Sequence, residues 1–120
     1  MKAEDRSLLD WLSDIEINAA KIIAHTATLT FEEFMADEPV GDLVITKLQN
    51  MGEASTHIAT RYPHYAQTAA LPLGAMRLMR NRLAHGYFNL KYDFIWQTAR
   101  TDVPIVLEAV RILMATEGKQ

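Results

Sequence analysis

Residues 76–88 read Met76-Arg77-Leu78-Met79-Arg80-Asn81-Arg82-Leu83-Ala84-His85-Gly86-Tyr87-Phe88, and the rest of the chain is best interpreted outward from them. The stretch predicts a helix that ends near Gly86, because glycine often terminates helices. With about 100° between successive residues, Arg77, Asn81 and His85 lie within roughly 140° of Arg80 on one side. The apolar residues lie on the opposite side: Met76, Met79 and Leu83. One face can therefore pack while the other presents a guanidinium, a carboxamide and an imidazole.

The polar face of this helix carries groups that suit a phosphodiester. Histidine exchanges a proton near neutral pH, and arginine offers a planar fork of donors to phosphate oxygens. His85 and Arg80 are therefore candidates for phosphodiester chemistry, and Asn81 is placed to orient the imidazole or the phosphate. A simpler interpretation is that arginine and histidine near a helix C-terminus only stabilise the helix dipole. The short pattern R-x4-H does not decide between the two.

Positive charge gathers in residues 77–91, against the sign of the whole chain. The net charge is −3, which is atypical of a general nucleic-acid binder. An RNA ligand would therefore be held at a local positive site, and Arg77, Arg82 and Lys91 join Arg80 in a segment that contains no acidic residue. One small patch contributes little affinity through counterion release. A symmetric dimer would double it.

Three segments of the chain resemble the signature of HepT-like HEPN toxins. Residues 80–88 are similar to the R-x4-H-x-Y motif of that family. Residues 51–54, Met-Gly-Glu-Ala, are similar to its Ile-Gly-Glu-Ala helix, and residues 92–96 with the later Pro104 are similar to its aspartate, tryptophan and proline. The resemblance extends over about residues 8–115, and the three segments in this order are far more specific than any one alone.

This resemblance implies a metal-independent endoribonuclease that works without a cofactor, as the toxin of a toxin–antitoxin pair, and as a homodimer. It also implies a nucleotidyltransferase antitoxin of the MntA type that attaches AMP to Tyr87. Such AMPylation would place negative charge and bulk where the RNA phosphate must bind. Packing of Tyr87 on the bundle is the alternative role for this side chain, and both can hold. A different function also stays open, because HEPN-like dimers can bind a nucleotidyltransferase without cutting RNA.

The chemistry on RNA can be argued from the residue types. The sequence offers no evident metal cluster or side-chain nucleophile, so the obvious attacking group is the 2′-hydroxyl of the RNA itself. His85 could remove that proton or protonate the leaving 5′-oxygen, and Arg80 could stabilise the charge that develops on the phosphoryl oxygens. One histidine cannot conveniently serve both faces of an in-line displacement. A two-fold dimer solves this by bringing two copies of His85 and Arg80 into one cleft.

Length and composition indicate a single soluble domain over residues 1–120. Hydrophobic residues make up 49% of the chain and charged residues 22%, as in ordinary globular proteins. The absence of cysteine excludes disulfides and fits a reducing compartment. No apolar run reaches the roughly 18 residues that cross a bilayer, and the first six residues lack the apolar core of a secretion signal. We therefore expect a cytoplasmic protein that does not bind membranes.

Apolar residues that repeat at spacings of three and four predict an all-α fold. We expect an up-and-down four-helix bundle of the HEPN-like type, with a short extra helix after the first long one. The long helices are predicted at residues 7–27, 40–61, 73–85 and from 93 onward, with a kink or restart near Pro104. Beyond Pro104 the predicted apolar stripe continues through Ile105, Val106, Leu107, Val110, Leu113 and Met114.

The connections between the long helices also carry predictions. Thr30 and Glu33 have the spacing of a capping box that opens the short helix. That helix is expected to turn Phe31, Phe34 and Met35 toward the core. Residues 62–72 are predicted as a loop, whose aromatic residues pad the bundle or stack on bases. Asp93 is expected to cap the fourth long helix.

Glu53 is the residue of the resembling segments that is hardest to place. Its neighbour Gly52, inside a helix, suggests a close helix approach. An inward Glu53 would pair with Arg80 or Arg82, because an unpaired buried carboxylate is costly, and would support the motif. A solvated Glu53 is equally compatible with the sequence. The chain departs from the family pattern at three places: Thr46 with Lys47 beside it, Leu73 and Leu78.

Overall fold

The computed structural model describes residues 6–66 and 92–117, and within them every regular element is helical. The all-α prediction is confirmed, as is the short extra helix after the first long one. The predicted helix at 73–85 and the turn after it lie outside the described residues. The elements in chain order are α1 (Leu8–Thr26), α2 (Phe31–Ala36), α3 (Glu38–Arg61), α4 (Pro63–Ala66), α6 (Tyr92–Gln97), the π-helical turn η3 (Thr98–Asp102) and α7 (Val103–Glu117).

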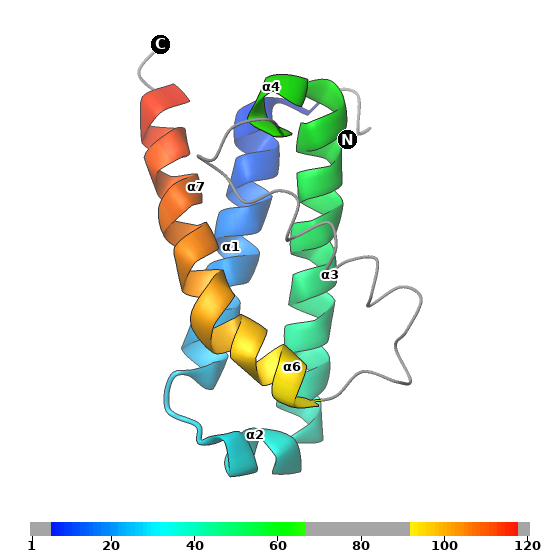
Figure 1. Cartoon of the computed structure of the whole chain (residues 1–120), viewed down its shortest axis with the longest axis vertical. Helices are drawn as coiled ribbons and strands as arrows, with labels where there is room; N and C mark the ends of the chain where they lie inside the picture. The colour runs from blue at the N-terminus through cyan, green and yellow to red at the C-terminus, as the bar shows by residue number, and fades with distance from the viewer. Residues whose placement is uncertain (1–5, 67–91, 118–120) are drawn as a thin grey trace.

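Helix α1 lies at the centre of the described fold and packs against both α3 and α7 (Figure 1). It runs antiparallel to both, while α2 closes one end of the bundle and α4 lies at the other. The side chains between these helices form one apolar core, and each large one contributes about 1.5–3 kcal/mol on burial. Its fully covered members include Leu12, Ile15, Ile22, Phe34, Val44, Ile58, Ile95, Val103 and Val110.

Helices α1 and α2 each begin with a reciprocal capping box. The Ser7 hydroxyl accepts the Asp10 backbone N–H at 3.2 Å, and the Asp10 carboxylate accepts the Ser7 N–H at 2.9 Å. Thr30 and Glu33 make the same pair of bonds at 3.1 and 2.9 Å, as predicted. Two otherwise unpaired backbone donors are satisfied in each case, which is why both helices start at these points.

The junction of α2 and α3 is tighter than predicted. Asp37 ends α2 and also caps α3 by accepting the Val40 N–H at 3.1 Å, so α3 begins at Glu38 rather than at residue 40. The inward prediction is right for Phe34, which is buried, but wrong for Met35, which is 53% exposed. Adjacent helical residues are about 100° apart, so a helix this short cannot bury both.

The segment predicted as a loop at 62–72 begins with a short helix, α4, at Pro63–Ala66. Proline is well tolerated at a first helical position, where its missing N–H would have no partner. Tyr62 packs partly buried against the core, as the packing interpretation of these aromatics predicts. The remainder of the predicted loop, residues 67–72, lies outside the described residues.

The predicted interruption near Pro104 is present as the π-helical turn η3, which joins α6 to α7 at a visible bend (Figure 1). Proline has no N–H to continue the ladder, and a wider turn accommodates its ring. Thr98, in this turn, is buried and donates its hydroxyl to the Phe94 carbonyl at 2.8 Å. Asp93 lies in the first turn of α6 instead of preceding it, and its carboxylate accepts the Phe94 N–H at 2.8 Å.

Among the described residues, none of the helices combines the length and the apolar character that a bilayer crossing requires.

Candidate functional site

The structure describes one of the predicted site residues, Glu53. The others fall in the segment 67–91, outside the described residues: Arg77, Arg80, Asn81, Arg82, His85, Tyr87 and Lys91. Their roles therefore stay predictions.

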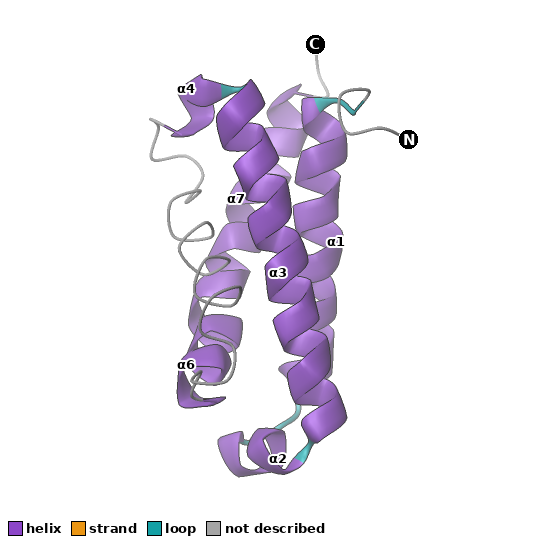
Figure 2. Cartoon of the chain, turned by 90° about the vertical axis from the view of Figure 1, so that its right-hand side faces the viewer, coloured by secondary structure: helices purple, strands orange, loops and turns teal. Residues whose placement is uncertain are grey.

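The Glu53 side chain lies outside the apolar core, whereas its neighbours along α3 do not. Met51, Gly52 and Ala54 are buried, and α3 runs beside α1 in the bundle (Figure 2). The Glu53 side chain is 52% exposed. The carboxylate is therefore not buried in the core, and its pairing with an arginine of the motif stays a prediction. The suggested partners of its carboxylate, Arg80 and Arg82, lie in the segment that is not described.

Glu53 begins a row of polar side chains along α3, continued by His57 and Arg61 at intervals of four residues. The guanidinium of Arg61 lies 2.7 Å from His57 Nδ1. Arginine can only donate, so Nδ1 is the acceptor and the ring proton resides on Nε2. That nitrogen faces the Glu53 carboxylate at 3.5 Å. The imidazole in this arrangement bridges a guanidinium and a carboxylate.

Trp11 of α1 packs against the middle residue of this row, His57. His57 stacks on its indole at a centroid distance of 4.1 Å, with the rings within 8° of parallel. The Arg6 guanidinium lies 4.2 Å from the same indole centroid, and sterics place it on the opposite face. The indole is 5% exposed, and its Nε1 has no hydrogen-bond partner. Both faces of Trp11 are thus covered by polar side chains, and the stack with His57 links α1 to α3.

Arg6, which precedes α1, is held in place by an acid on that helix. Its guanidinium donates to the Asp14 carboxylate at 2.6 Å and to the Asp10 carbonyl at 3.2 Å. The hydrogen bond to Asp14 raises the pKa of Arg6, so this side chain is cationic at any accessible pH. The pKa of Asp10 is lowered, mainly because its carboxylate accepts the Ser7 backbone N–H. The start of α1 is consequently a fixed array of charges.

A small open depression of about 300 Å³ lies between α1 and α3 beside these groups. Asn50 of α3 donates to the Asn18 side-chain oxygen across it at 3.1 Å. The lining combines charges of both signs with amides and an indole: Arg6, Trp11, Asp14, Asn18, Asn50, Glu53 and Ala54. Such a lining can hydrogen-bond a polar group, but the two carboxylates make it a poor site for a phosphate.

The sequence-based prediction missed His57 and Arg61 as neighbours of Glu53. A detectable signal was present, because E-x3-H-x3-R places three polar side chains on one stripe of a helix. The stack on Trp11 was not detectable in this way, since residues 11 and 57 belong to different helices. Their proximity follows from how α1 and α3 pack.

The downstream segment that resembles the family packs at the opposite end of the bundle. Trp96 lies 5.1 Å from the Phe34 ring and 6.2 Å from the Phe31 ring, between centroids. The Arg100 guanidinium covers the indole of Trp96 at 5.2 Å and donates to the Thr26 carbonyl at 2.9 Å. These contacts tie α2 and the end of α1 to α6, so this segment has a structural role in the described fold.

Comparison with known proteins identifies a family for most of the chain. Residues 15–113 match the family model described as Ribonuclease HepT-like. That range includes residues 76–88.

Named relatives point the same way. A Thermococcus cleftensis protein named "Probable ribonuclease HepT" is 32% identical over 99 residues, which cover 82% of this chain and 88% of the relative. "Putative RNase MJ1216" of Methanocaldococcus jannaschii is 31% identical over 119 residues, covering 95% and 93%. "Putative RNase MJ0127" of the same organism is 32% identical over 114 residues, covering 91% and 89%. No solved structure matches the chain significantly.

Proposed function

The chain belongs to the HepT-like ribonuclease family, and we propose that it is a metal-independent endoribonuclease toxin whose activity is controlled by a nucleotidyltransferase antitoxin. The observation that carries this proposal is that the family match and the motif fall on the same part of the chain. The family match covers residues 15–113, and the matched range contains Arg80-Asn-Arg-Leu-Ala-His85-Gly-Tyr87, the R-x4-H-x-Y arrangement. Relatives named as ribonucleases support RNA as the substrate.

Cleavage proceeds by attack of the 2′-oxygen of the RNA on the adjacent phosphorus. A P–O bond forms to the 2′-oxygen and the bond to the 5′-oxygen breaks, which leaves a 2′,3′-cyclic phosphate and a free 5′-hydroxyl. His85 accepts the 2′-hydroxyl proton or donates one to the leaving oxygen. Arg80 donates hydrogen bonds to the phosphoryl oxygens as negative charge grows on them. Asn81 orients the imidazole or the phosphate.

A homodimer supplies the second proton-transfer group. In-line displacement puts the attacking and leaving oxygens on opposite sides of the phosphorus, beyond the reach of one imidazole. Two subunits related by a two-fold axis bring two His85 and two Arg80 side chains to one cleft. Arg77, Arg82 and Lys91 then contribute charge from both subunits to bind the RNA backbone.

Glu53 is proposed as a supporting residue at the edge of this site. Its exposed carboxylate lies on α3 next to His57, and His57 in turn contacts Arg61. An arginine of the motif, Arg80 or Arg82, that approached α3 would find an acceptor there. The hydrogen bonds would restrict the guanidinium to one orientation.

Tyr87 is proposed as the residue that the antitoxin modifies. Its phenolic oxygen would attack the α-phosphorus of ATP on the nucleotidyltransferase, with loss of pyrophosphate, to give an AMP ester. The tyrosine follows His85 by two residues, so the added phosphate would carry negative charge into the region that binds RNA. Modification would therefore block substrate binding without unfolding the protein.

Cleavage assays with purified protein and RNA test the proposed nuclease. We expect Arg80→Ala and His85→Ala each to lower the cleavage rate by at least 100-fold, because each removes a group needed in the transition state. His25→Ala is the matched control, since His25 is an exposed histidine at the end of α1 and should leave the rate unchanged. Full activity of a folded His85→Ala protein would remove His85 from the mechanism. A wild-type protein that binds a nucleotidyltransferase but never cuts RNA would instead be a non-catalytic binding module.

A further inference from the structure

The outward face of α7 carries large apolar side chains that the described fold leaves uncovered. Ile105 and Ile112 are each 60% exposed. The sequence pattern predicts Ile105 as part of the buried stripe, and this is wrong: the buried side chains of α7 are Val103, Val106, Leu107 and Val110. Residues 105 and 112 are two helical turns apart, so they form one ridge along the helix. Exposed apolar ridges of this kind are typical of protein interfaces.

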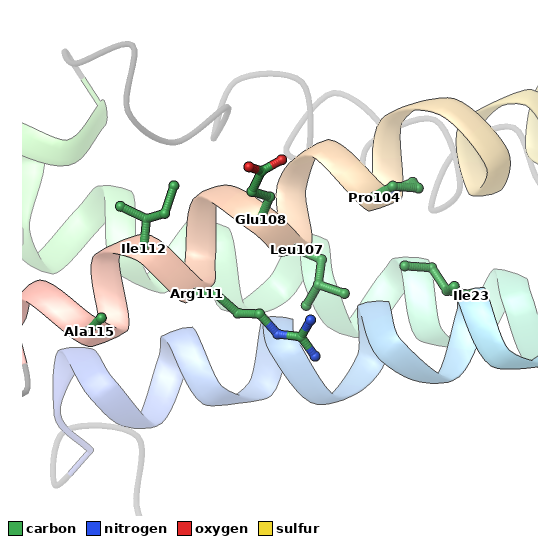
Figure 3. Close-up of a pocket in the computed structure, with 7 residues that line it drawn as sticks. All are labelled: Ile23, Pro104, Leu107, Glu108, Arg111, Ile112 and Ala115. Carbon is green, nitrogen blue, oxygen red and sulfur yellow. The ribbon is translucent and has the colours of Figure 1, made fainter.

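A groove flanks the ridge on each side. One, of about 390 Å³, lies between α7 and α1 (Figure 3) and is lined by Ile23, Pro104, Leu107, Glu108, Arg111, Ile112 and Ala115. The other, of about 350 Å³, is lined by Ile105, Glu108, Ala109, Ile112 and Leu113. Ile112 and Glu108 border both. Helices commonly pack by inserting a ridge of side chains from one helix into a groove on the other.

The charges on this face are complementary to those on the same face of a second copy. Glu108 and Arg111 are three residues apart, and both are exposed. Arg111 contacts Glu16 of α1 through Nε at 3.2 Å, and its side chain remains 58% exposed, so the two terminal nitrogens of the guanidinium can reach a further acceptor. A two-fold axis midway between residues 108 and 111 would place Glu108 of each copy level with Arg111 of the other. Two ion pairs would form symmetrically.

The same axis matches the apolar groups. In an antiparallel pair of α7 helices, Ile112 of one copy would lie level with Leu107 of the other, which lines the groove beside α1. Pro104 would lie level with Ala115, whose small side chain lets the helices approach closely. One arrangement therefore pairs the charges and places the small Ala115 where the helices must approach, as an isologous interface requires.

From this we propose that the outward face of α7 is a self-association surface, on which a second copy of this chain packs antiparallel and pairs Glu108 with Arg111. The surface is separate in sequence from residues 76–88, which the catalytic dimer of the proposed function uses. Association through α7 therefore does not depend on RNA cleavage. Burial of the isoleucines supplies most of the attraction, and the ion pairs fix the register.

Mass measurement in solution tests the apolar part of the surface. Sedimentation velocity at several concentrations should give Ile112→Arg an average mass about half that of the wild type, because one of its interfaces is lost. Met35→Arg is the matched control, because Met35 is an apolar residue of similar exposure, 53%, on α2 at the far end of the bundle (Figure 1). Its mass should equal that of the wild type. Equal masses for Ile112→Arg and the wild type would overturn the proposal and leave the face for a different protein.

Charge reversal tests the pairing itself. Glu108→Arg alone and Arg111→Glu alone should each dissociate, since like charges would then face each other across the axis. An equimolar mixture of the two single variants should regain the wild-type mass, because each copy now offers the complement of the other. Failure of the mixture to associate, with both variants folded by circular dichroism, would overturn the antiparallel register. RNA cleavage is measured in parallel, so the nuclease and the interface can fail independently.

Discussion

At the scale of single residues, Trp11 joins α1 to α3 through a stack on His57. One face carries the imidazole of His57 and the other the guanidinium of Arg6. Both contacts are close enough for stacking and cation–π attraction, each worth about 0.5–2 kcal/mol when desolvated. The indole nitrogen, in contrast, is buried without an acceptor. The ring stabilises the helix pair through its faces, not through its N–H.

This distinction predicts different costs for two substitutions of Trp11. Trp11→Ala should lower the free energy of unfolding by about 3–5 kcal/mol, because it removes a buried aromatic ring and opens a cavity. Trp11→Phe keeps a ring between His57 and Arg6 and removes an unpaired donor, so it should cost less than half as much. Urea denaturation followed by far-UV circular dichroism measures both. Equal losses would show that the indole N–H has an acceptor after all.

Asp10 gives α1 a pH dependence with a definite sign. Its pKa is lowered from the ordinary value of 3.8 by the hydrogen bonds with Ser7. A lowered pKa means that the carboxylate contributes stability above pH 3.8, and this contribution is lost as the pH falls below that value. The melting temperature of the wild type should thus exceed that of Asp10→Asn at pH 6. The difference should shrink below pH 3.8, and a constant difference across this range would contradict the role of the capping box.

At the scale of elements, the α6–η3–α7 segment shows how a break in a helix is stabilised. Pro104 prevents a regular helix, and the wider turn at Thr98–Asp102 absorbs the missing hydrogen bond. Arg100 projects from this turn to the end of α1, where it donates to the carbonyls of Thr26 and Ala27 at 2.9 and 3.3 Å. These are carbonyls that a helix C-terminus leaves without an intrahelical partner. Arg100, in the irregular turn between α6 and α7, therefore caps the C-terminus of α1.

Removing this cap should destabilise the fold at one end. Arg100→Ala is expected to lower the free energy of unfolding by about 1–2 kcal/mol, since it removes two charge-assisted hydrogen bonds and the cover over Trp96. Lys21→Ala is the control, because Lys21 is an exposed cation on α1 and its loss should cost less than about 1 kcal/mol. Hydrogen exchange at residues 26–29 should accelerate in Arg100→Ala. Protection unchanged at those amides would contradict the capping role.

At the scale of the whole molecule, the sequence predicts best what depends on neighbouring residues. The capping box at Thr30 and the break near Pro104 were predictable because each arises within a few residues of chain. The burial of Phe34 beside an exposed Met35, and the exposure of Ile105, depend on which face meets another helix. Periodicity gives the width of an apolar stripe but not how much of it the fold covers.

For the candidate site as well, residue identities were recognisable from the sequence, whereas exposure and contacts depend on helix packing. Glu53 was recognisable from Met-Gly-Glu-Ala, yet its exposure and its contact with His57 depend on the rotation of α3 against α1. The residues proposed for chemistry, Arg80 and His85, lie outside the described residues. Their proposed roles therefore rest on the motif in the sequence, and the family match covers the range that contains them.

The chemical nature of the ends produced from RNA distinguishes attack by the 2′-hydroxyl from attack by water. The wild-type protein, with excess EDTA, should cut an RNA oligonucleotide to give 2′,3′-cyclic phosphate and 5′-hydroxyl ends, identified by mass spectrometry. The same oligonucleotide with a 2′-deoxynucleotide immediately 5′ of the cut should remain whole at that position, because the attacking oxygen is gone. Products ending in a 3′-hydroxyl and a 5′-phosphate, or cleavage at the deoxy position, would contradict attack by the 2′-hydroxyl.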